Sequence, residues 1–321
     1  MRYRPVHRTL FIVATAILGL GWACYESLPF RAEGTFEREF RVETPLNLEI
    51  ENRAGDIRIV GWDSHRVVIR GRIEARALTQ ESADELLETI RAQPPVRLHD
   101  PRLLRITPAR KRDRQRVRID YELNVPVDTE VELRTGAGDI AITRITGPTT
   151  ITVGAGQIEV EDIQRKVRLI SGAGDVRIRR IDDDVNITTG VGDIVGERIH
   201  GDIELKTGTG DVELSRVAGE LDAKIGVGDI RISSVELPQD GAWRIDVGTG
   251  DVEIILPEDA GFWISAKTGL GSVRMDFPLT RMVVTKPRAV EGTVGAGGFR
   301  MHIRSGMGTI RIQSWRPAER E

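Results

Sequence analysis

The chain has 321 residues, of which 40% are hydrophobic, 30% are charged and only 5% are aromatic. This composition excludes an extensively disordered chain, and a net charge of −3 provides no overall field that would attract nucleic acid. A single cysteine, Cys24, excludes a disulfide within the chain. The 34 glycines and the few large rings favour thin, regularly stacked β layers built from Ile, Val and Leu.

Residues 1–24 are typical of an export signal. Three arginines precede an uncharged, mostly apolar run over residues 9–23. This run is shorter than the about 20 residues that span a bilayer with ease, so a signal peptide is favoured over a short uncleaved anchor. The run ends in Leu-Gly-Trp-Ala-Cys, which resembles a bacterial lipobox and makes Cys24 a candidate for lipidation. The alternatives are ordinary cleavage and a cysteine inside an uncleaved helix.

The first 24 residues therefore predict an exported chain, tethered to a membrane through its N-terminus on the periplasmic or cell-surface side. Residues 25–34 follow as a predicted linker. Export makes DNA or RNA an improbable partner.

Residues 35–130 predict irregular strands with one helix. Apolar residues mark strands at 36–42, 46–50, 56–59, 67–73, 103–107 and 117–125. A helix is predicted over residues 79–91, because Thr79 can cap it, acids follow in the first turn, and Leu86, Leu87 and Ile90 share one side. We interpret this region as an irregular start of the repeat that follows, with the helix covering an open end.

Residues 131–254 hold a regular repeat. The tripeptide Gly-x-Gly begins at Gly136, Gly154, Gly172, Gly190, Gly208 and Gly226, which is a constant step of 18 residues. Apolar columns keep the same step and alternate with polar residues, as in half-buried strands. Oppositely charged residues also fall on each other in the repeat, for example Glu159 and Arg177. The pattern predicts an all-β fold, a parallel β-solenoid (β-helix) of 18-residue coils, with Gly-x-Gly-Asp at one corner.

The pattern loosens at both sides of this region. Further Gly-x-Gly copies begin at residues 248, 269, 295 and 306, and an isolated relative is Ala54-Gly55-Asp56. Residues 255–315 predict longer coils, with Trp263, Phe277 and Trp315 as bulk that closes the end. Residues 316–321 are predicted to be a tail.

Two stretches carry a resemblance to a known family. Residues 52–62, NRAGDIRIVGW, and residues 121–126, YELNVP, lead into the Gly-x-Gly-Asp coils and resemble the bacterial β-strand-repeat family called "putative adhesin, domain of unknown function". The resemblance covers roughly residues 35–315. It implies an envelope protein with a parallel β-solenoid and no established catalytic residues, so no functional residue can be carried over.

A column of acids follows the second glycine of the repeat and is a low-odds candidate for a calcium ladder: Asp139, Asp175, Asp193, Asp211, Asp229 and Asp251. The spacing does not match the nine-residue calcium-binding β-roll. The alternative, which we favour, is that each carboxylate bonds backbone N–H groups of the turn. Gln157 in the same column fits that alternative better than it fits a metal ligand.

A second candidate is the basic run that contains Arg110, Lys111, Arg112, Arg114 and Arg116. It could contact anionic envelope material, and the alternative is a solvated hairpin loop. The Gly-x-Gly motif does not predict nucleotide binding, because a strand rather than a helix follows it. No nucleophile motif or zinc spacing is present, so we expect no cofactor and no catalytic residues.

The function favoured by the sequence is a non-catalytic adhesion or envelope-polymer binding module, with envelope glycans or other envelope proteins as partners. A self-associating or stress-linked scaffold is the second reading, and a polysaccharide-active enzyme is a distant third.

Overall fold

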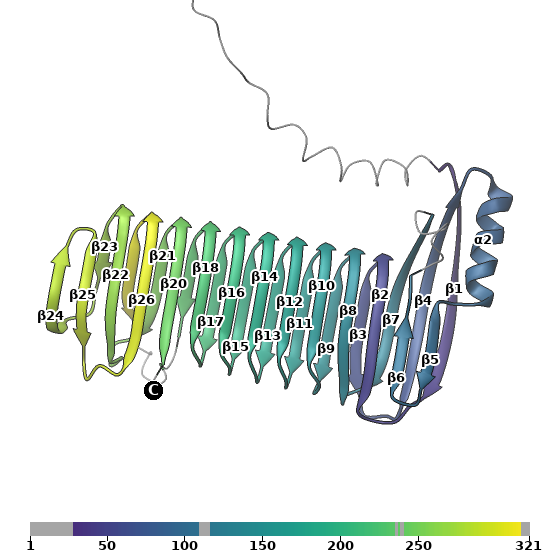
Figure 1. Cartoon of the computed structure of the whole chain (residues 1–321), viewed down its shortest axis with the longest axis horizontal. Helices are drawn as coiled ribbons and strands as arrows, with labels where there is room; N and C mark the ends of the chain where they lie inside the picture. The colour runs from purple at the N-terminus through teal and green to yellow at the C-terminus, as the bar shows by residue number, and fades with distance from the viewer. Residues whose placement is uncertain (1–27, 109–115, 235–236, 238–240, 316–321) are drawn as a thin grey trace, which may run out of the picture.

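The structure is a computed structural model that describes residues 28–108, 116–234, 237 and 241–315. Two long sheets face each other over most of the length of an elongated stack, with one helix at one end (Figure 1). The prediction of a mostly β chain with largely parallel sheets and one short helix is confirmed, and the arrangement is β-solenoid-like.

Sheet A has 13 strands, in this spatial order: β1 (Phe30–Arg41), β4 (Arg66–Ala77), β7 (Val117–Pro126), β3 (Ile57–Trp62), β9 (Ile140–Ile145), β11 (Ile158–Ile163), β13 (Val176–Ile181), β15 (Ile194–Ile199), β17 (Val212–Val217), β19 (Ile230–Ser233), β21 (Val252–Pro257), β27 (Ile310–Trp315) and β23 (Val273–Met275).

Sheet B has 14 strands, in this spatial order: β24 (Leu279–Lys286), β25 (Ala289–Val294), β22 (Phe262–Leu270), β26 (Phe299–Met307), β20 (Ala242–Thr249), β18 (Leu221–Val227), β16 (Ile203–Thr209), β14 (Val185–Val191), β12 (Val167–Ala173), β10 (Thr149–Ala155), β8 (Thr129–Ala137), β2 (Leu46–Ala54), β6 (Leu103–Ile106) and β5 (Val96–Asp100).

The 18-residue step of the sequence reappears as the register of the parallel ladders. Thr149 pairs with Val167, Val167 with Val185 and Val185 with Ile203 in sheet B. Sheet A keeps the same step, as in the pair Ile158 and Val176. Because strand residues alternate in direction, every second residue points between the sheets, and buried Ile, Val and Leu fill the core there.

Both ends of the stack depart from chain order. The strand pair β2–β3 lies between the pair β6–β7 and the pair β8–β9, although both of these pairs follow it in the sequence. At the other end, the last two strands β26 and β27 lie between β20–β21 and β22–β23. Trp315 accordingly pairs with Pro257 inside the stack, whereas Phe277 packs edge-to-face on Phe262 at 5.3 Å between ring centroids.

The helix is α2 (Gln80–Ala92), one residue later than predicted at both ends. The Thr79 side chain caps it by accepting a bond from the Ser82 N–H at 3.2 Å. Its buried residues Ala83, Leu87 and Ile90 face β1 and β4, so the helix covers the end of the stack (Figure 1). Strand β1 begins at Phe30, within the predicted linker, because β1 pairs with β4 along its whole length.

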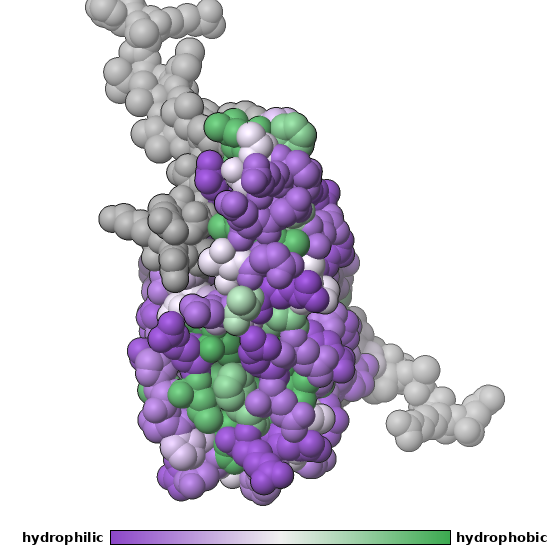
Figure 2. Space-filling model, turned by 90° about the vertical axis from the view of Figure 1, so that its right-hand side faces the viewer, coloured by the Kyte–Doolittle hydropathy of each residue, from purple (hydrophilic) through white to green (hydrophobic). Residues whose placement is uncertain are grey.

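Figure 2 looks onto the end that carries α2 and shows it covered mostly by hydrophilic side chains. Among the described residues, no helix has the length and hydropathy needed to cross a bilayer.

One column of the core contains hydroxyl groups without partners. The inward residue before each Gly-x-Gly is Thr135, Ser171, Thr189 or Thr207 in four coils, and these hydroxyls make no hydrogen bond within the described residues. Other coils place Val153, Ile225 or Val247 in the same column. A buried hydroxyl without a partner costs about 1 kcal/mol or more in desolvation.

We therefore expect the double substitution Thr189→Val/Thr207→Val to raise the free energy of unfolding by about 2 kcal/mol, because valine has the same shape without the hydroxyl. Urea-induced unfolding measures the change. The matched control is Thr268→Val in the corresponding column, since the Thr268 hydroxyl donates to the Gly308 carbonyl at 2.8 Å and its loss should destabilise. Destabilisation by the double substitution would contradict the prediction.

Candidate functional site

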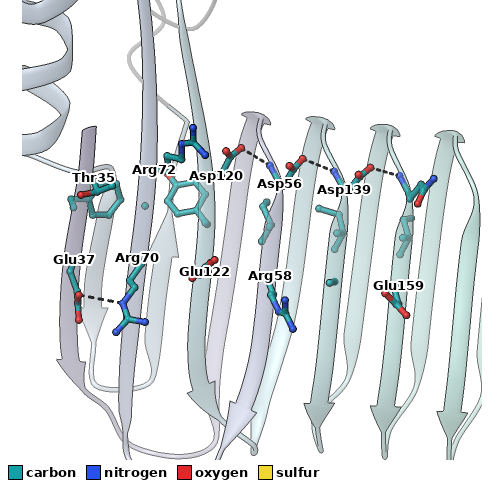
Figure 3. A pocket seen from close by; sticks show the side chains of 18 of the residues that line it. Thr35, Glu37, Asp56, Arg58, Arg70, Arg72, Asp120, Glu122, Asp139 and Glu159 are labelled. Atoms are coloured by element: carbon teal, nitrogen blue, oxygen red, sulfur yellow. Dashed lines mark hydrogen bonds and ion pairs between the residues drawn. The ribbon is translucent and has the colours of Figure 1, made fainter. Parts of the chain in front are cut away.

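The candidate site is a cleft of about 840 Å³ on the outer face of sheet A, where β1, β4 and β7 meet the first regular coils (Figure 3). Strands β4 and β7 run antiparallel, whereas β7, β3 and β9 run parallel. The cleft therefore lies at the junction between the irregular N-terminal strands and the repeat. Its floor is backbone, because the inward side chains of these strands, such as Tyr121 and Ile140, are buried.

A row of charged side chains crosses the cleft from strand to strand. The registers align Glu37 with Arg70, Arg70 with Glu122, Glu122 with Arg58, Arg58 with Ala141, Ala141 with Glu159, and Glu159 with Arg177. The signs alternate along this row, with Ala141 as its one uncharged member, and opposite charges on neighbouring strands attract each other. Figure 3 shows the labelled members side by side across the sheet.

Three members of this row have no ionic partner. Arg70 Nε lies 3.3 Å from Glu37 Oε2, and Arg179 reaches diagonally to Glu159 at 2.6 Å. Within the described residues, Arg58, Glu122 and Arg177 make no ion pair and no side-chain hydrogen bond, and all three are exposed. The cleft therefore offers both a guanidinium donor and a carboxylate acceptor to a ligand.

The acid column forms the rim of this cleft and continues along the stack. Where the column holds an aspartate, a carboxylate oxygen accepts a hydrogen bond from the backbone N–H of the residue in the next coil; Gln157 interrupts this series. Asp120 Oδ1 accepts from Asp56 at 3.0 Å, and Asp56 Oδ1 accepts from Asp139 at 3.0 Å. Further bonds join Asp139 to Gln157, Asp175 to Asp193, Asp193 to Asp211, Asp211 to Asp229, Asp229 to Asp251 and Asp251 to Thr309, at 2.7–3.1 Å.

This geometry accounts for the acid column by backbone bonding between coils, rather than within one turn as the sequence suggested. The Thr309 N–H, aided by the Arg311 guanidinium, holds the pKa of Asp251 below its usual range. Among the residues that the structure describes, no three His, Cys, Asp or Glu side chains are grouped as metal ligands.

The isolated Ala54-Gly55-Asp56 belongs to the same ladder. Gly55 has φ 128°, as the second glycines of the repeat do, and Ala54 pairs with Ala137. Arg118 Nη2 binds Asp56 at 3.0 Å, and its Nε binds Asp120 at 3.0 Å, which neutralises the first two acids.

A second groove, of about 570 Å³, follows the opposite corner of the coils. Its strand residues Arg144, Asp162, Arg180 and Arg198, with Arg216 beyond them, all have φ between 54° and 61°. A left-handed conformation costs a residue other than glycine about 1 kcal/mol or more. No glycine marks this column, so this corner could not be recognised from the sequence.

The cations of the second groove are already paired. Arg180 binds Asp162 and Glu161, and its guanidinium lowers the pKa of Asp162. Arg144 lies 3.6 Å from Asp63, and Arg216 lies 3.1 Å from Glu197. This groove is therefore the weaker candidate for ligand binding.

The remaining sequence candidates are placed as follows. Cys24, Arg110, Lys111, Arg112 and Arg114 lie outside the described residues. Arg116 immediately precedes β7, and its carbonyl accepts a bond from the Arg76 N–H at 2.8 Å. Of the described histidines, His200 contacts Asp182 at 3.3 Å, and the ring of His302 lies tilted against Trp263 at 5.1 Å between centroids; the two lie at separate places along the molecule.

A family model for "Toastrack DUF4097" matches residues 120–217 and 183–313, which together cover more than half of the chain. The chain belongs to the Toastrack DUF4097 family. The resemblance to bacterial adhesin-like repeat proteins is thereby confirmed, and the family is one of unknown function. The matched residues begin at Asp120, so Glu37, Arg58 and Arg70 of the cleft lie in front of the shared region.

Solved structures similar to this chain come from several bacteria. A "putative adhesin" from Bacteroides fragilis shares 13% identity, covers 87% of this chain and 97% of its own, and gives a TM-score of 0.40. A "putative lipid binding protein" from Parabacteroides distasonis shares 11% identity over 87% and 96%, with a TM-score of 0.44. A "putative adhesin" from Parabacteroides merdae shares 11% over 87% and 95%, with a TM-score of 0.34. Likenesses this low carry no information on ligand or role, and no curated protein matches the chain.

Proposed function

We propose that this Toastrack protein is a non-catalytic adhesion or envelope-polymer binding module, exported and held at a membrane through its N-terminus. We further propose the cleft between β1, β4, β7 and the first coils as its ligand site. The observation that carries the proposal is the alternating row of charges in that cleft, in which Arg58, Glu122 and Arg177 have no partner within the described residues. Exposed, uncompensated charges on a rigid sheet are suited to a polar ligand.

The chemistry of the row points to a ligand with both acceptors and donors. Guanidinium groups bind carboxylate or hydroxyl oxygens, and carboxylates accept bonds from hydroxyl, amide or ammonium groups. A cell-wall polymer or an outer glycan has such groups along its length. The cleft contains no exposed aromatic ring, because Phe36 and Tyr121 are buried, so recognition would depend on polar contacts.

The test is a binding measurement with residues 28–321 against purified cell-wall polymer and outer glycans. We expect saturable binding that Arg58→Gln/Glu122→Gln weakens about a hundredfold or more, because each of the two lost charged hydrogen bonds is worth about 1.5 kcal/mol or more. Arg165→Gln/Arg168→Gln is the control, because these exposed arginines lie in the turn between β11 and β12 and at the start of β12, outside the cleft. Equal binding by parent and cleft variant would refute the cleft as the site.

A self-associating scaffold remains the alternative function. The structure speaks against association through the β1 end of sheet A. Strand β1 lies at that edge and carries cross-strand ion pairs on its outer face, such as Arg66 with Glu39 at 2.9 Å, and charged edge strands oppose pairing with further strands. Sedimentation of residues 28–321 as a concentration-independent monomer would exclude association through the ends.

A further inference from the structure

The large hydrophobic side chains that stay exposed are gathered on one long edge. Within the described residues they are Phe30, Leu78, Val191, Val227, Leu270 and Met307, with exposed fractions of 41–66%. Val191, Val227, Leu270 and Met307 each occupy the middle of a Gly-x-Gly corner. Phe30 begins β1, and Leu78 follows the end of β4.

These positions share an edge because of the register. Phe30 pairs with Ala77, Ala75 with Val117, Tyr121 with Ile57, and Ile57 with Ile140, which follows a Gly-x-Gly corner. The start of β1, the end of β4 and the Gly-x-Gly corners that precede sheet A strands therefore lie on the upper edge of the molecule in Figure 1, which we call the Gly-x-Gly edge. The copy at residues 295–297 is the exception, because antiparallel β25 ends beside the start of β22, at the opposite edge. Figure 2 shows hydrophobic side chains gathered at its upper tip.

The corner residues form a continuous row along this edge. The middle residues pair in register from coil to coil, with Val191 next to Thr209, Thr209 next to Val227, Thr249 next to Met307, and Met307 next to Leu270. Neighbouring coils are about 4.8 Å apart. Val191, Val227 and Met307 follow one another two coils apart, with Thr209 and Thr249 between them, and Leu270 lies next to Met307. Such an exposed apolar row is typical of an interaction surface rather than of chance exposure.

Basic side chains flank the apolar row on the side of sheet B. Lys267 pairs in register with Arg304, both are exposed, and neither makes an ion pair within the described residues. Arg288 Nη1 donates to the Gly269 carbonyl at 3.2 Å, beside Leu270. On the side of sheet A the flank is the acid ladder, in which one oxygen of each bonded carboxylate is held by an amide.

The position of the first described strand indicates what the Gly-x-Gly edge contacts. Strand β1 begins on this edge at Phe30, and only residues 24–29 separate it from the uncharged, mostly apolar run over residues 9–23. A chain that enters a bilayer through those residues would bring this edge to the membrane surface. Apolar tips beside lysine and arginine are the combination that binds an anionic membrane interface.

We propose that the Gly-x-Gly edge lies against an anionic lipid bilayer. Val191, Val227, Leu270 and Met307 enter the interfacial layer, and Lys267 and Arg304 contact the lipid phosphates. The acids on the side of sheet A tilt the stack so that the flank of sheet B is nearer to the lipid. The cleft takes no part in this contact, so the proposal is independent of the proposed ligand site.

The test uses residues 28–321, without the leader, and sedimentation with phosphatidylcholine vesicles that contain or lack phosphatidylglycerol. We expect the fragment to pellet with the anionic vesicles. Replacing all four corner residues by threonine should weaken binding about tenfold or more, since apolar burial is lost. Thr209 and Thr249 occupy the same column, so the fold accepts threonine there.

Two further variants separate the contribution of charge to vesicle binding from that of apolar burial. Lys267→Gln/Arg304→Gln should weaken binding to anionic vesicles roughly thirtyfold, because each of the two cations near the surface contributes about 1 kcal/mol. The control Arg165→Gln/Arg168→Gln removes two cations from the opposite edge and should bind as the parent does. A fragment that stays in the supernatant, or a four-threonine variant that pellets like the parent, would overturn the proposal.

An insertion measurement gives the orientation directly. The fragment contains no cysteine, because Cys24 is the single cysteine of the chain. An environment-sensitive dye on Leu270→Cys should show the blue shift of an apolar surrounding on vesicles, whereas the same dye on Arg168→Cys should not. Equal spectra at the two positions would also overturn the proposal.

Discussion

Replacing Gly192 by alanine is expected to lower the free energy of unfolding by about 3 kcal/mol or more. Gly192 has φ 142°, a region that residues with a Cβ rarely adopt. A Cβ built there would lie 2.2 Å from the Gly174 carbonyl oxygen of the preceding coil, so two backbones would have to separate. The midpoint of urea-induced unfolding measures the loss.

The neighbouring substitution Val191→Ala is the control for this prediction. Val191 is 56% exposed and occupies the middle of the same corner, where other coils carry alanine. It should change the free energy of unfolding by less than about 0.5 kcal/mol. A Gly192→Ala protein as stable as the Val191→Ala protein would show that the coils do not need this close backbone contact.

Ending the chain after Gly298 is expected to release residues 258–298 from the stack. The removed strands β26 and β27 separate β20–β21 from β22–β23, so their loss detaches β22–β23 from the stack and leaves β23 without a paired strand. The truncation also removes Phe299, which packs edge-to-face on buried Trp243 at 5.5 Å. Limited proteolysis with mass spectrometry should find rapid cleavage within residues 258–298 and protected coils over residues 131–234.

A chain that ends after Trp315 is the control for the truncation, because it keeps both strands. It should resist protease as the full chain does. If residues 258–298 stay protected without β26 and β27, then β22 and β23 can close directly onto β20 and β21, and the observed strand order is not required for stability.

The regular part of this fold could be predicted from sequence because one physical requirement recurs in every coil. Each coil needs glycine at the corner and apolar residues that face inward, so an 18-residue step of both fixes the ladder register. The same logic placed α2, since Thr79 supplies a cap and Leu87 and Ile90 supply a buried side. These patterns are local, so they can be recognised in the sequence without knowing which segments become neighbours in the fold.

The strand order at both ends could not be predicted in the same way. Whether residues 46–62 stack on residues 103–126 or on residues 129–145 depends on how side chains fit across the stack, and the structure places them between the two. The cleft was missed for the same reason. Arg58, Glu122 and Glu37 are far apart in the sequence. They are aligned by the antiparallel pairing of β4 with β1 and β7 and by the parallel pairing of β7 with β3.

The acid column shows that a sequence pattern can be recognised correctly without its hydrogen-bond donor being identified. Its spacing is visible in the sequence, and turn bonding was the favoured reading. The donor, however, is the backbone of the next coil, as in the bond from the Asp211 N–H to Asp193 Oδ1 at 2.8 Å. A sequence periodicity reports that a residue recurs, but not whether its contact lies within a repeat or between repeats.

The position of β2–β3 has a consequence for the order in which the chain can fold. This coil is made early, yet both of its neighbours in the stack are made later, one from residues 103–126 and one from residues 129–145. If the chain leaves the cell's interior N-terminus first, this coil would emerge without either neighbour until about residue 126 had passed, although β1 and β4 could already pair. It would be enclosed on both sides only after about residue 145 had followed.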